Sequence, residues 1–420
     1  MTSIRFRGIA SLAAVALIAA ACGGDDDSGT TADDPAEITV EEESAEAATD
    51  TETTDTEPAG TTETETTDTE PAGTETTTAP EATGDPVTDE LAAIVAQFSS
   101  PPESIPVTEP VGADVPTGKT MYFITCGVEI CELYTPILQA AVDILEWNLE
   151  VISTDGSPES VANAWDQVVN DQPDAVMYTG TPRSQVEQQM TAAAANGTSI
   201  VGCCVVDAED DVLDAVIVKE NEVGTQGAIT AAWLLTDAAA NGNPTPGTLY
   251  IDLPDFPILT QVGVEFRKSM TEYCPDCAQE ELVMGLADLG SLADQVTSAL
   301  RANPEIKYVV PSTDSIAIGL PAVIASAGLD DVEVFGNGPS LATLQEIESG
   351  ERKGTMAFAA WENIFAMVDA VVRIEAGVPA LDSYPPVNYI LTADNIESTS
   401  ELSRIIPDVE AQFAALWGKG

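Results

Sequence analysis

The chain has 420 residues, of which 14 are lysine or arginine and 71 are aspartate or glutamate, so its formal net charge is −57. A chain this acidic repels nucleic acid and anionic lipid, and both are poor candidate partners. It contains no histidine, which excludes histidine-based triads and general bases and most catalytic zinc sites. We therefore expect no catalytic residues, no metal and no cofactor.

The first 22 residues indicate export. Arg5 and Arg7 form a basic start, and residues 9–21 are an apolar run that is too short to span a bilayer comfortably. The small residues before Cys22 resemble a bacterial lipobox, although Ala19 occupies a position where that motif prefers leucine. The resemblance implies a lipid on Cys22 that anchors the protein to the outer face of the cell membrane. An ordinary cleaved signal with an incidental cysteine is the alternative.

Residues 23–118 carry 26 acidic residues and no lysine or arginine. Up to Pro86 they are almost entirely Thr, Glu, Asp, Pro, Ala and Gly, and the word TETTDTEPAGT occurs at residues 51–61 and again at 64–74. Such a segment buries too little apolar surface to offset its ordering entropy. We expect a disordered acidic stalk, in which residues 91–98 form a short helix that docks on the folded body.

From Lys119 onward, short apolar strands alternate with helices. We expect strands at residues 121–125, 149–153, 175–178 and 199–202, and then at 248–252, 281–284, 307–311, 332–335 and 354–358. Helices are expected at residues 133–147, 157–170, 184–196, 259–273, 292–303, 315–327 and 340–349. This alternation predicts an α/β fold whose parallel sheets are covered on both faces. About 300 residues are too many for one core, so the two series predict two similar lobes.

Several short sequence motifs occur one after another along this folded part. They include QPDAVM at residues 172–177, NGTSIV at 196–201, NEVG at 221–224, GVEF at 263–266, DSIAIG at 314–319 and VFGNG at 334–338. Together they resemble the type I periplasmic binding proteins, in particular the sugar-binding branch typified by ribose-binding proteins. The resemblance covers residues 119–377 and implies two Rossmann-like lobes joined by three hinge crossings.

The same resemblance implies an N-lobe of residues 119–221 and 359–386, and a C-lobe of residues 222–358 and 387–420. A ligand would then lie between the lobes at the carboxyl ends of the strands, and hinge closure would trap it. The implied function is that of a monomeric, extracytoplasmic solute-binding protein that passes a small molecule to the permease of an ABC importer. A sensory binding protein that presents its ligand to a receptor is the alternative.

Six cysteines remain besides Cys22, an even number for an oxidising compartment. The predicted local disulfides are Cys126–Cys131 and Cys274–Cys277, with Cys203 and Cys204 forming either a strained vicinal pair or two buried thiols. Two unrelated buried thiols are the alternative at Cys126 and Cys131. The spacing of Cys274 and Cys277 also occurs in redox motifs, so a thiol-redox protein is a further, weaker alternative.

The candidate ligand-binding residues follow the ends of the expected strands. They are Glu129, Glu132 and Tyr134 in the first loop, Thr179 and Gly180 after the third strand, Phe256, Thr260, Thr313, Asp314 and Asn337 in the C-lobe, and Phe358 and Trp361 at the hinge. Each of them has a structural alternative, such as packing on a helix face or capping a helix.

Three departures from the sugar-binding pattern predict the character of the ligand. Cys204-Val205 replaces an Asp-Arg pair, Val262 replaces an arginine, and Phe358 replaces a glutamine. Sugar hydroxyls are held by charged or amide groups in bidentate hydrogen bonds. We therefore expect a pocket less polar than a monosaccharide site and a small amphipathic or aromatic ligand. Asp314 or Asn337 would hold its polar end, and Phe358 would stack on it.

Overall fold

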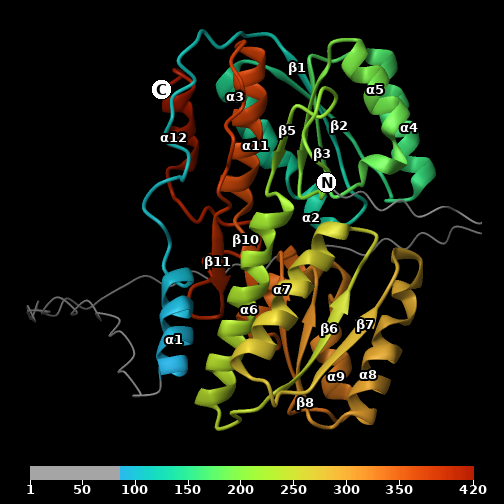
Figure 1. Ribbon diagram of the computed structural model, residues 1–420, viewed down its shortest axis with the longest axis vertical. Helices are drawn as coiled ribbons and strands as arrows, with labels where there is room; N and C mark the ends of the chain where they lie inside the picture. Colours follow the sequence, from blue (N-terminus) through green and yellow to red (C-terminus); the bar gives the residue numbers. More distant parts are fainter. Residues whose placement is uncertain (1–85) are drawn as a thin grey trace, which may run out of the picture. The chain divides into compact units, whose positions relative to one another are not determined.

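A computed structural model describes residues 86–420 (Figure 1). The predicted signal peptide, the lipidation site Cys22 and the repeats of the acidic segment lie outside the described residues. Within residues 86–420, no helix combines the length and the apolar character that crossing a membrane requires. These residues fold into two lobes, each built on one β-sheet.

The N-lobe contains five parallel strands in the order β2-β1-β3-β4-β5. The strands are β1 (Thr120–Ile124), β2 (Asn148–Ile152), β3 (Ala175–Thr179), β4 (Ser199–Cys203) and β5 (Ala215–Ile217). Its helices are α2 (Glu129–Glu132), α3 (Thr135–Leu145), α4 (Pro158–Asp171), α5 (Glu187–Ala195), α11 (Ala360–Glu375) and α12 (Val409–Leu416).

Strand β1 shows why this sheet needs helices on both faces. Met121 and Phe123 pack with α3 and α11, whereas Tyr122 and Ile124 pack with α4 and α5. Figure 1 shows these two pairs of helices on opposite faces of the sheet. Side chains of a strand alternate between the faces of a sheet, so an uninterrupted apolar run demands cover on both. The predicted α/β class with parallel sheets is confirmed.

The C-lobe contains six strands in the order β11-β10-β9-β8-β6-β7, of which only β11 is antiparallel to its neighbour. The strands are β6 (Gly247–Asp252), β7 (Gln279–Val283), β8 (Ile306–Pro311), β9 (Glu333–Asn337), β10 (Gly354–Phe358) and β11 (Asn388–Leu391). Its helices are α6 (Glu220–Ala240), α7 (Pro257–Tyr273), α8 (Leu292–Ala302), α9 (Leu320–Ser326) and α10 (Leu341–Ser349).

The stalk prediction needs correction between residues 86 and 118. Helix α1 (Pro86–Phe98) packs on α6 of the C-lobe, as expected for a docking helix, and Leu91 is buried there. The following extended segment buries Ile105, Val107 and Val111 against the N-lobe. These apolar side chains bury surface that the preceding Thr/Glu-rich sequence lacks, so residues 86–118, here called the N-terminal arm, are part of the folded body.

The C-terminal boundary also needs correction. Strand β11 joins the C-lobe sheet, but α12 packs on α3 and α11 of the N-lobe. Phe413 and Trp417 stack around Phe365 of α11, and this aromatic cluster holds the chain end on the N-lobe. Residues 392–408 therefore add a connection between the lobes to the three that were expected.

The predicted helix at residues 315–327 is also interrupted. The structure has a short 3-10 turn at Asp314–Ile316 and then α9, with Gly319 between them at φ 75°. A positive φ ends a helical turn, and glycine adopts it without steric cost. The break separates the end of β8 from α9 and leaves Thr313 at a strand end.

Candidate functional site

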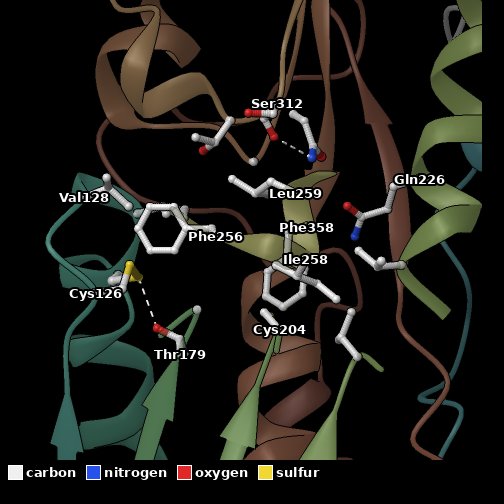
Figure 2. A pocket seen from close by; sticks show the side chains of 18 of the residues that line it. Cys126, Val128, Thr179, Cys204, Gln226, Phe256, Ile258, Leu259, Ser312 and Phe358 are labelled. Carbon is white, nitrogen blue, oxygen red and sulfur yellow. Dashed lines mark hydrogen bonds between the residues drawn. A yellow bond between two sulfur atoms is a disulfide. The ribbon is translucent and has the colours of Figure 1, made fainter. Parts of the chain in front are cut away.

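A cavity of about 90 Å³ lies where the carboxyl ends of strands from both lobes meet (Figure 2). The N-lobe residues that line it are Cys126, Val128, Ile130, Cys131, Tyr134, Thr179, Gly180, Cys204 and Val218. Those of the C-lobe are Val223, Gln226, Phe256, Ile258, Leu259, Ser312, Thr313, Asn337, Gly338 and Phe358. None of these residues is charged, so polar recognition in this pocket depends on amides and hydroxyls.

The polar side chains gather on the C-lobe side. Ser312 and Thr313 follow β8 directly, Asn337 ends β9, and Gln226 projects from α6 (Figure 2). The Asn337 Nδ2 donates a hydrogen bond to the Ser312 carbonyl oxygen at 3.0 Å, and the Gln226 Nε2 donates one to Asn388 Oδ1 at 3.2 Å. One N–H of each amide is therefore committed to a protein acceptor.

Two buried polar atoms of the pocket have no hydrogen-bond partner among the described residues. They are Ser312 Oγ and Asn337 Oδ1. A buried polar atom without a partner costs about 1–3 kcal/mol, and such atoms are rare in folded proteins. Their presence in the wall of a pocket is typical of a site that receives a ligand or water.

Three aromatic rings form the apolar part of the pocket. The rings of Tyr134 and Phe358 lie with their centroids 6.2 Å apart, and burial raises the pKa of the Tyr134 hydroxyl well above its usual value. Phe256, from the C-lobe, packs against the backbone of Gly180 in the N-lobe. A Cβ at Gly180 would lie 2.8 Å from the Phe256 ring, and φ at this glycine is 72°. Glycine at this position allows the two lobes to touch.

Cysteines contribute much of the N-lobe wall. Cys126 and Cys131 are paired across the first loop, and the Cys131 sulfur lies 3.1 Å from Thr179 Oγ1. Cys204 follows β4 next to Cys203 and adopts φ 61°. By contrast, Cys274 and Cys277 are paired at the end of α7, within the core that α6 and α7 share. Of the cysteines within residues 86–420, Cys126, Cys131 and Cys204 line the pocket and the other three do not.

Seven of the twelve predicted ligand-binding residues line the cavity: Tyr134, Thr179, Gly180, Phe256, Thr313, Asn337 and Phe358. The other five, Glu129, Glu132, Thr260, Asp314 and Trp361, do not. Glu129 begins the short helix α2, and Glu132 accepts a hydrogen bond from Ser153 at 3.4 Å. The Thr260 hydroxyl is directed to Asp252 at 3.1 Å.

Asp314 is a clear correction, because its carboxylate is committed to the protein interior. Its Oδ1 pairs with Arg352 at 2.9 Å, and the same guanidinium pairs with Glu346 at 2.8 Å. Burial raises the pKa of Asp314 to about 6, although Arg352 opposes that rise. Arg352 also donates a hydrogen bond to the Ala317 carbonyl oxygen, so the Asp314–Arg352–Glu346 triad holds the loop after β8 in place. Asp314 therefore positions Thr313 and does not itself line the pocket.

Trp361 is the second correction. Its Nε1 donates a hydrogen bond to the Leu402 carbonyl oxygen at 2.8 Å, and the Arg404 guanidinium lies 3.5 Å above its ring. Trp361 thus holds the connection between β11 and α12 and is buried away from the cavity.

Several lining residues were not predicted, notably Ser312, Gln226, Ile258 and Leu259. The position of Ser312 directly after β8 was a usable signal, since strand ends supplied the other candidates. Gln226 was missed because the helix that carries it was not predicted. Ile258 and Leu259 begin α7 beside Phe256, and their apolar character gave no sign of a pocket wall.

A family model described as the periplasmic binding protein domain matches residues 135–378. Among solved structures, an ABC transporter solute-binding protein from Agrobacterium vitis bound to α-D-tagatopyranose is 18% identical, with a TM-score of 0.57, and the match covers 67% of this chain and 97% of that one. A carbohydrate transporter protein from Acidothermus cellulolyticus in complex with myo-inositol is 15% identical, with a TM-score of 0.56 and coverage of 70% and 99%.

A glucose-galactose binding protein from Geobacillus stearothermophilus is 12% identical, with a TM-score of 0.59, and the match covers 67% of this chain and 100% of that one. None of the curated proteins matches the sequence. At these identities the structural likeness shows the fold.

Proposed function

Because the chain belongs to the periplasmic binding protein domain family, we propose that it is the extracytoplasmic solute-binding protein of an ABC importer. The family is one of substrate-binding proteins and not of enzymes. The observation that carries the proposal is the place of the cavity, which both lobes line at the carboxyl ends of their strands. Ligands of open α/β sheets bind at this edge. The proposed protein acts as a monomer and delivers its ligand to a permease.

Contacts across the cleft support a clamp. The Ile130 N–H of the N-lobe donates a hydrogen bond to Ser315 Oγ of the C-lobe at 3.4 Å, and Phe256 packs on Gly180. A ligand that bridges two such lobes stabilises their closed arrangement, which is hinge closure. A permease would then distinguish the closed, loaded protein from the open one.

The proposed ligand is less polar than a monosaccharide. Two of the structural relatives described above were solved with myo-inositol or tagatose, which carry hydroxyl groups around the ring. In this pocket, Phe358, Cys204 and Ile258 supply apolar surface, Val262 does not reach the cavity, and no lining side chain is charged. Buried hydroxyl groups without partners would each cost about 1–3 kcal/mol, so a sugar is a poor fit.

Binding is tested by the melting temperature of the purified protein in panels of sugars, amino acids, nucleosides and uncharged aromatic alcohols. A ligand that binds only the folded protein raises the melting temperature with its concentration. Phe358→Ala should weaken that binding at least several-fold, and Phe98→Ala, on the docking helix α1, should leave it unchanged. No shift with any panel, or equal binding by the Phe358 variant, contradicts the proposal.

We also propose that Cys22 carries the lipid that anchors the protein outside the cell. Mass spectrometry of the membrane fraction should find a lipid-modified N-terminal cysteine, and Cys22→Ser should release the protein into the medium. Equal retention of the variant in the membrane fraction contradicts the anchor and leaves the binding function intact. Co-purification with a permease, as opposed to a receptor, distinguishes import from sensing.

A further inference from the structure

The two lobes contribute walls of different chemistry to the pocket, and this difference defines the ligand more closely. Resting on the proposed function, we infer that the ligand is uncharged, carries a hydrogen-bond donor at the end that faces the C-lobe, and is apolar where it meets the N-lobe. The inference depends on three features: the missing charge, the free acceptor and the apolar wall.

The first feature is the absence of charge among the lining residues. An ion taken from water into such a pocket loses its hydration without gaining a counter-charge, which is far more costly than burying a neutral polar group. Asp314, which follows the lining residue Thr313 directly, is fully buried and paired with Arg352 at 2.9 Å, so it offers no counter-charge. The net charge of −33 on residues 119–420 repels anions further.

The second feature is a buried amide oxygen, Asn337 Oδ1, that has no donor, with the unpartnered Ser312 hydroxyl, which can donate or accept, beside it. The Ser312 carbonyl oxygen can accept but not donate, so its 3.0 Å contact fixes the Asn337 amide with Nδ2 toward the backbone and leaves Oδ1 free. Gln226 likewise uses Nε2 for Asn388, and its side chain lies at the rim of the cavity (Figure 2). The Ser312 hydroxyl is buried and unpartnered beside them. Amide oxygens accept only, so this end of the pocket requires an O–H or N–H from the ligand.

The third feature is the N-lobe wall. Val128, Ile130, Cys204 and Val218 present only carbon and sulfur, and the Thr179 hydroxyl already lies 3.1 Å from the Cys131 sulfur. Tyr134 adds one hydroxyl to this wall, so a ligand that is polar all round would leave most of its groups without partners on this side. A ligand with one polar end fits both walls, because the rings of Phe256 and Phe358 pack on its apolar part.

Four compounds that share a benzyl or phenyl ring test the inference in the purified full-length protein. Benzyl alcohol is uncharged and has a donor, benzyl methyl ether has none, benzylamine is a cation, and benzoate is an anion. Ribose, glucose and myo-inositol are measured beside them. We expect benzyl alcohol to raise the melting temperature and the other compounds to raise it less or not at all.

Two variants separate recognition from stability. Ser312→Ala removes an unpartnered hydroxyl from the pocket, so the ligand-free protein should be as stable as the wild type or more stable, and benzyl alcohol should bind about two- to tenfold more weakly. Tyr178→Phe removes another unpartnered, buried hydroxyl, which lies outside the pocket. It should leave benzyl alcohol binding unchanged.

The outcomes separate the two proposals. Stronger stabilisation by benzylamine, benzoate or a sugar overturns the inference about the ligand and supports the binding function. Equal stabilisation by benzyl methyl ether overturns the requirement for a donor, and unchanged binding in Ser312→Ala overturns the placement of the ligand's polar end beside Ser312. No shift with any of these compounds, sugars included, counts against the ligand inference and the binding function together.

Discussion

Gly180 is the residue at which an aromatic ring of one lobe meets the backbone of the other. Gly180→Ala should weaken ligand binding, because its Cβ would lie 2.8 Å from the Phe256 ring and would keep the lobes apart. The matched control is Gly197→Ala: both glycines have positive φ, at 72° and 92°, but nothing lies within 4 Å of a Cβ at Gly197. Both variants should lose about 1–2 kcal/mol of stability from backbone strain.

Only Gly180→Ala should lose affinity for the ligand, which titration calorimetry measures. Equal affinity in the two alanine variants would mean that the contact between Phe256 and Gly180 does not limit closure.

Glu362 is a buried carboxylate whose titration should affect stability. Its Oε1 accepts a hydrogen bond from the Ile406 N–H at 2.6 Å, and its Oε2 has no partner among the described residues. Burial raises the pKa of Glu362 from 4.5 to about 7, so the folded protein holds a proton that the unfolded chain releases. This contribution to stability is complete below pH 4.5 and is lost as the pH rises through about 7.

Glu362→Gln keeps the acceptor for Ile406 and removes the titration. Between pH 5 and 8, the free energy of unfolding should fall less steeply with pH in the variant than in the wild type. The difference between the two slopes should be at most about 1.4 kcal/mol per pH unit, because one proton is involved. Glu159→Gln, at an exposed position on α4, should keep the wild-type slope. Denaturant unfolding at several pH values measures both, and parallel slopes for wild type and Glu362→Gln would contradict the prediction.

At the scale of elements, the strands with long apolar runs were predictable, and the missed helices share a physical cause. Helix α6 is buried on most sides, so its sequence lacks the apolar stripe that marks a surface helix. In α11 the burial reaches the polar positions as well, because Glu362, Asp369 and Arg373 are buried with the apolar side chains. Strand β5 has only three residues, and β11 follows Pro385 and Pro386 with an antiparallel partner, outside the repeating strand and helix pattern.

The site was predictable to the extent that it follows strand ends. Thr313, Asn337 and Phe358 end or follow their strands and line the cavity. Asp314 also follows strand β8, but its carboxylate accepts a hydrogen bond from Arg352, which is 38 residues away, and is therefore directed into the protein interior. No local pattern reveals such a partner, and the same holds for Trp361 and Leu402.

The cysteine pairs belong to different elements and should have different effects. We propose that Cys126–Cys131, in the pocket loop, and Cys274–Cys277, at the end of α7, are disulfides in the exported protein. Non-reducing peptide mapping should find these two local pairs. Cross-links between the two regions would contradict the pairing.

Replacing both cysteines of a pair by serine tests what each pair does. The Cys126/Cys131 double variant should weaken ligand binding, because both residues line the cavity. The Cys274/Cys277 double variant should lower the melting temperature and leave binding unchanged, because its pair lies in the core of α6 and α7. The reverse pattern would show that the first loop is not part of the binding wall.

At the scale of the whole described chain, the N-terminal arm touches both lobes. Its helix α1 packs on α6 of the C-lobe, and the Tyr273 hydroxyl of α7 donates a hydrogen bond to Glu90 at 3.1 Å (Figure 1). Further along, the Val111 N–H donates to the Leu416 carbonyl oxygen of α12 at 3.0 Å, and Arg373 of α11 donates to the Glu109 carbonyl oxygen. The arm therefore joins the lobes outside the hinge connections.

Leu91→Ala should release the first part of this arm. Leu91 is 6% exposed in the core that α1 shares with α6, whereas Val87 on the same helix is 42% exposed. Truncating a buried leucine costs about 2–5 kcal/mol, and an exposed position changes stability by about 0.5 kcal/mol or less. Leu91→Ala should therefore make the arm sensitive to limited proteolysis, and Val87→Ala should not. If both variants are cleaved at the wild-type rate, residues 99–118 hold the arm on the N-lobe without help from α1; if both are cleaved faster, the docking of α1 does not depend on the burial of Leu91.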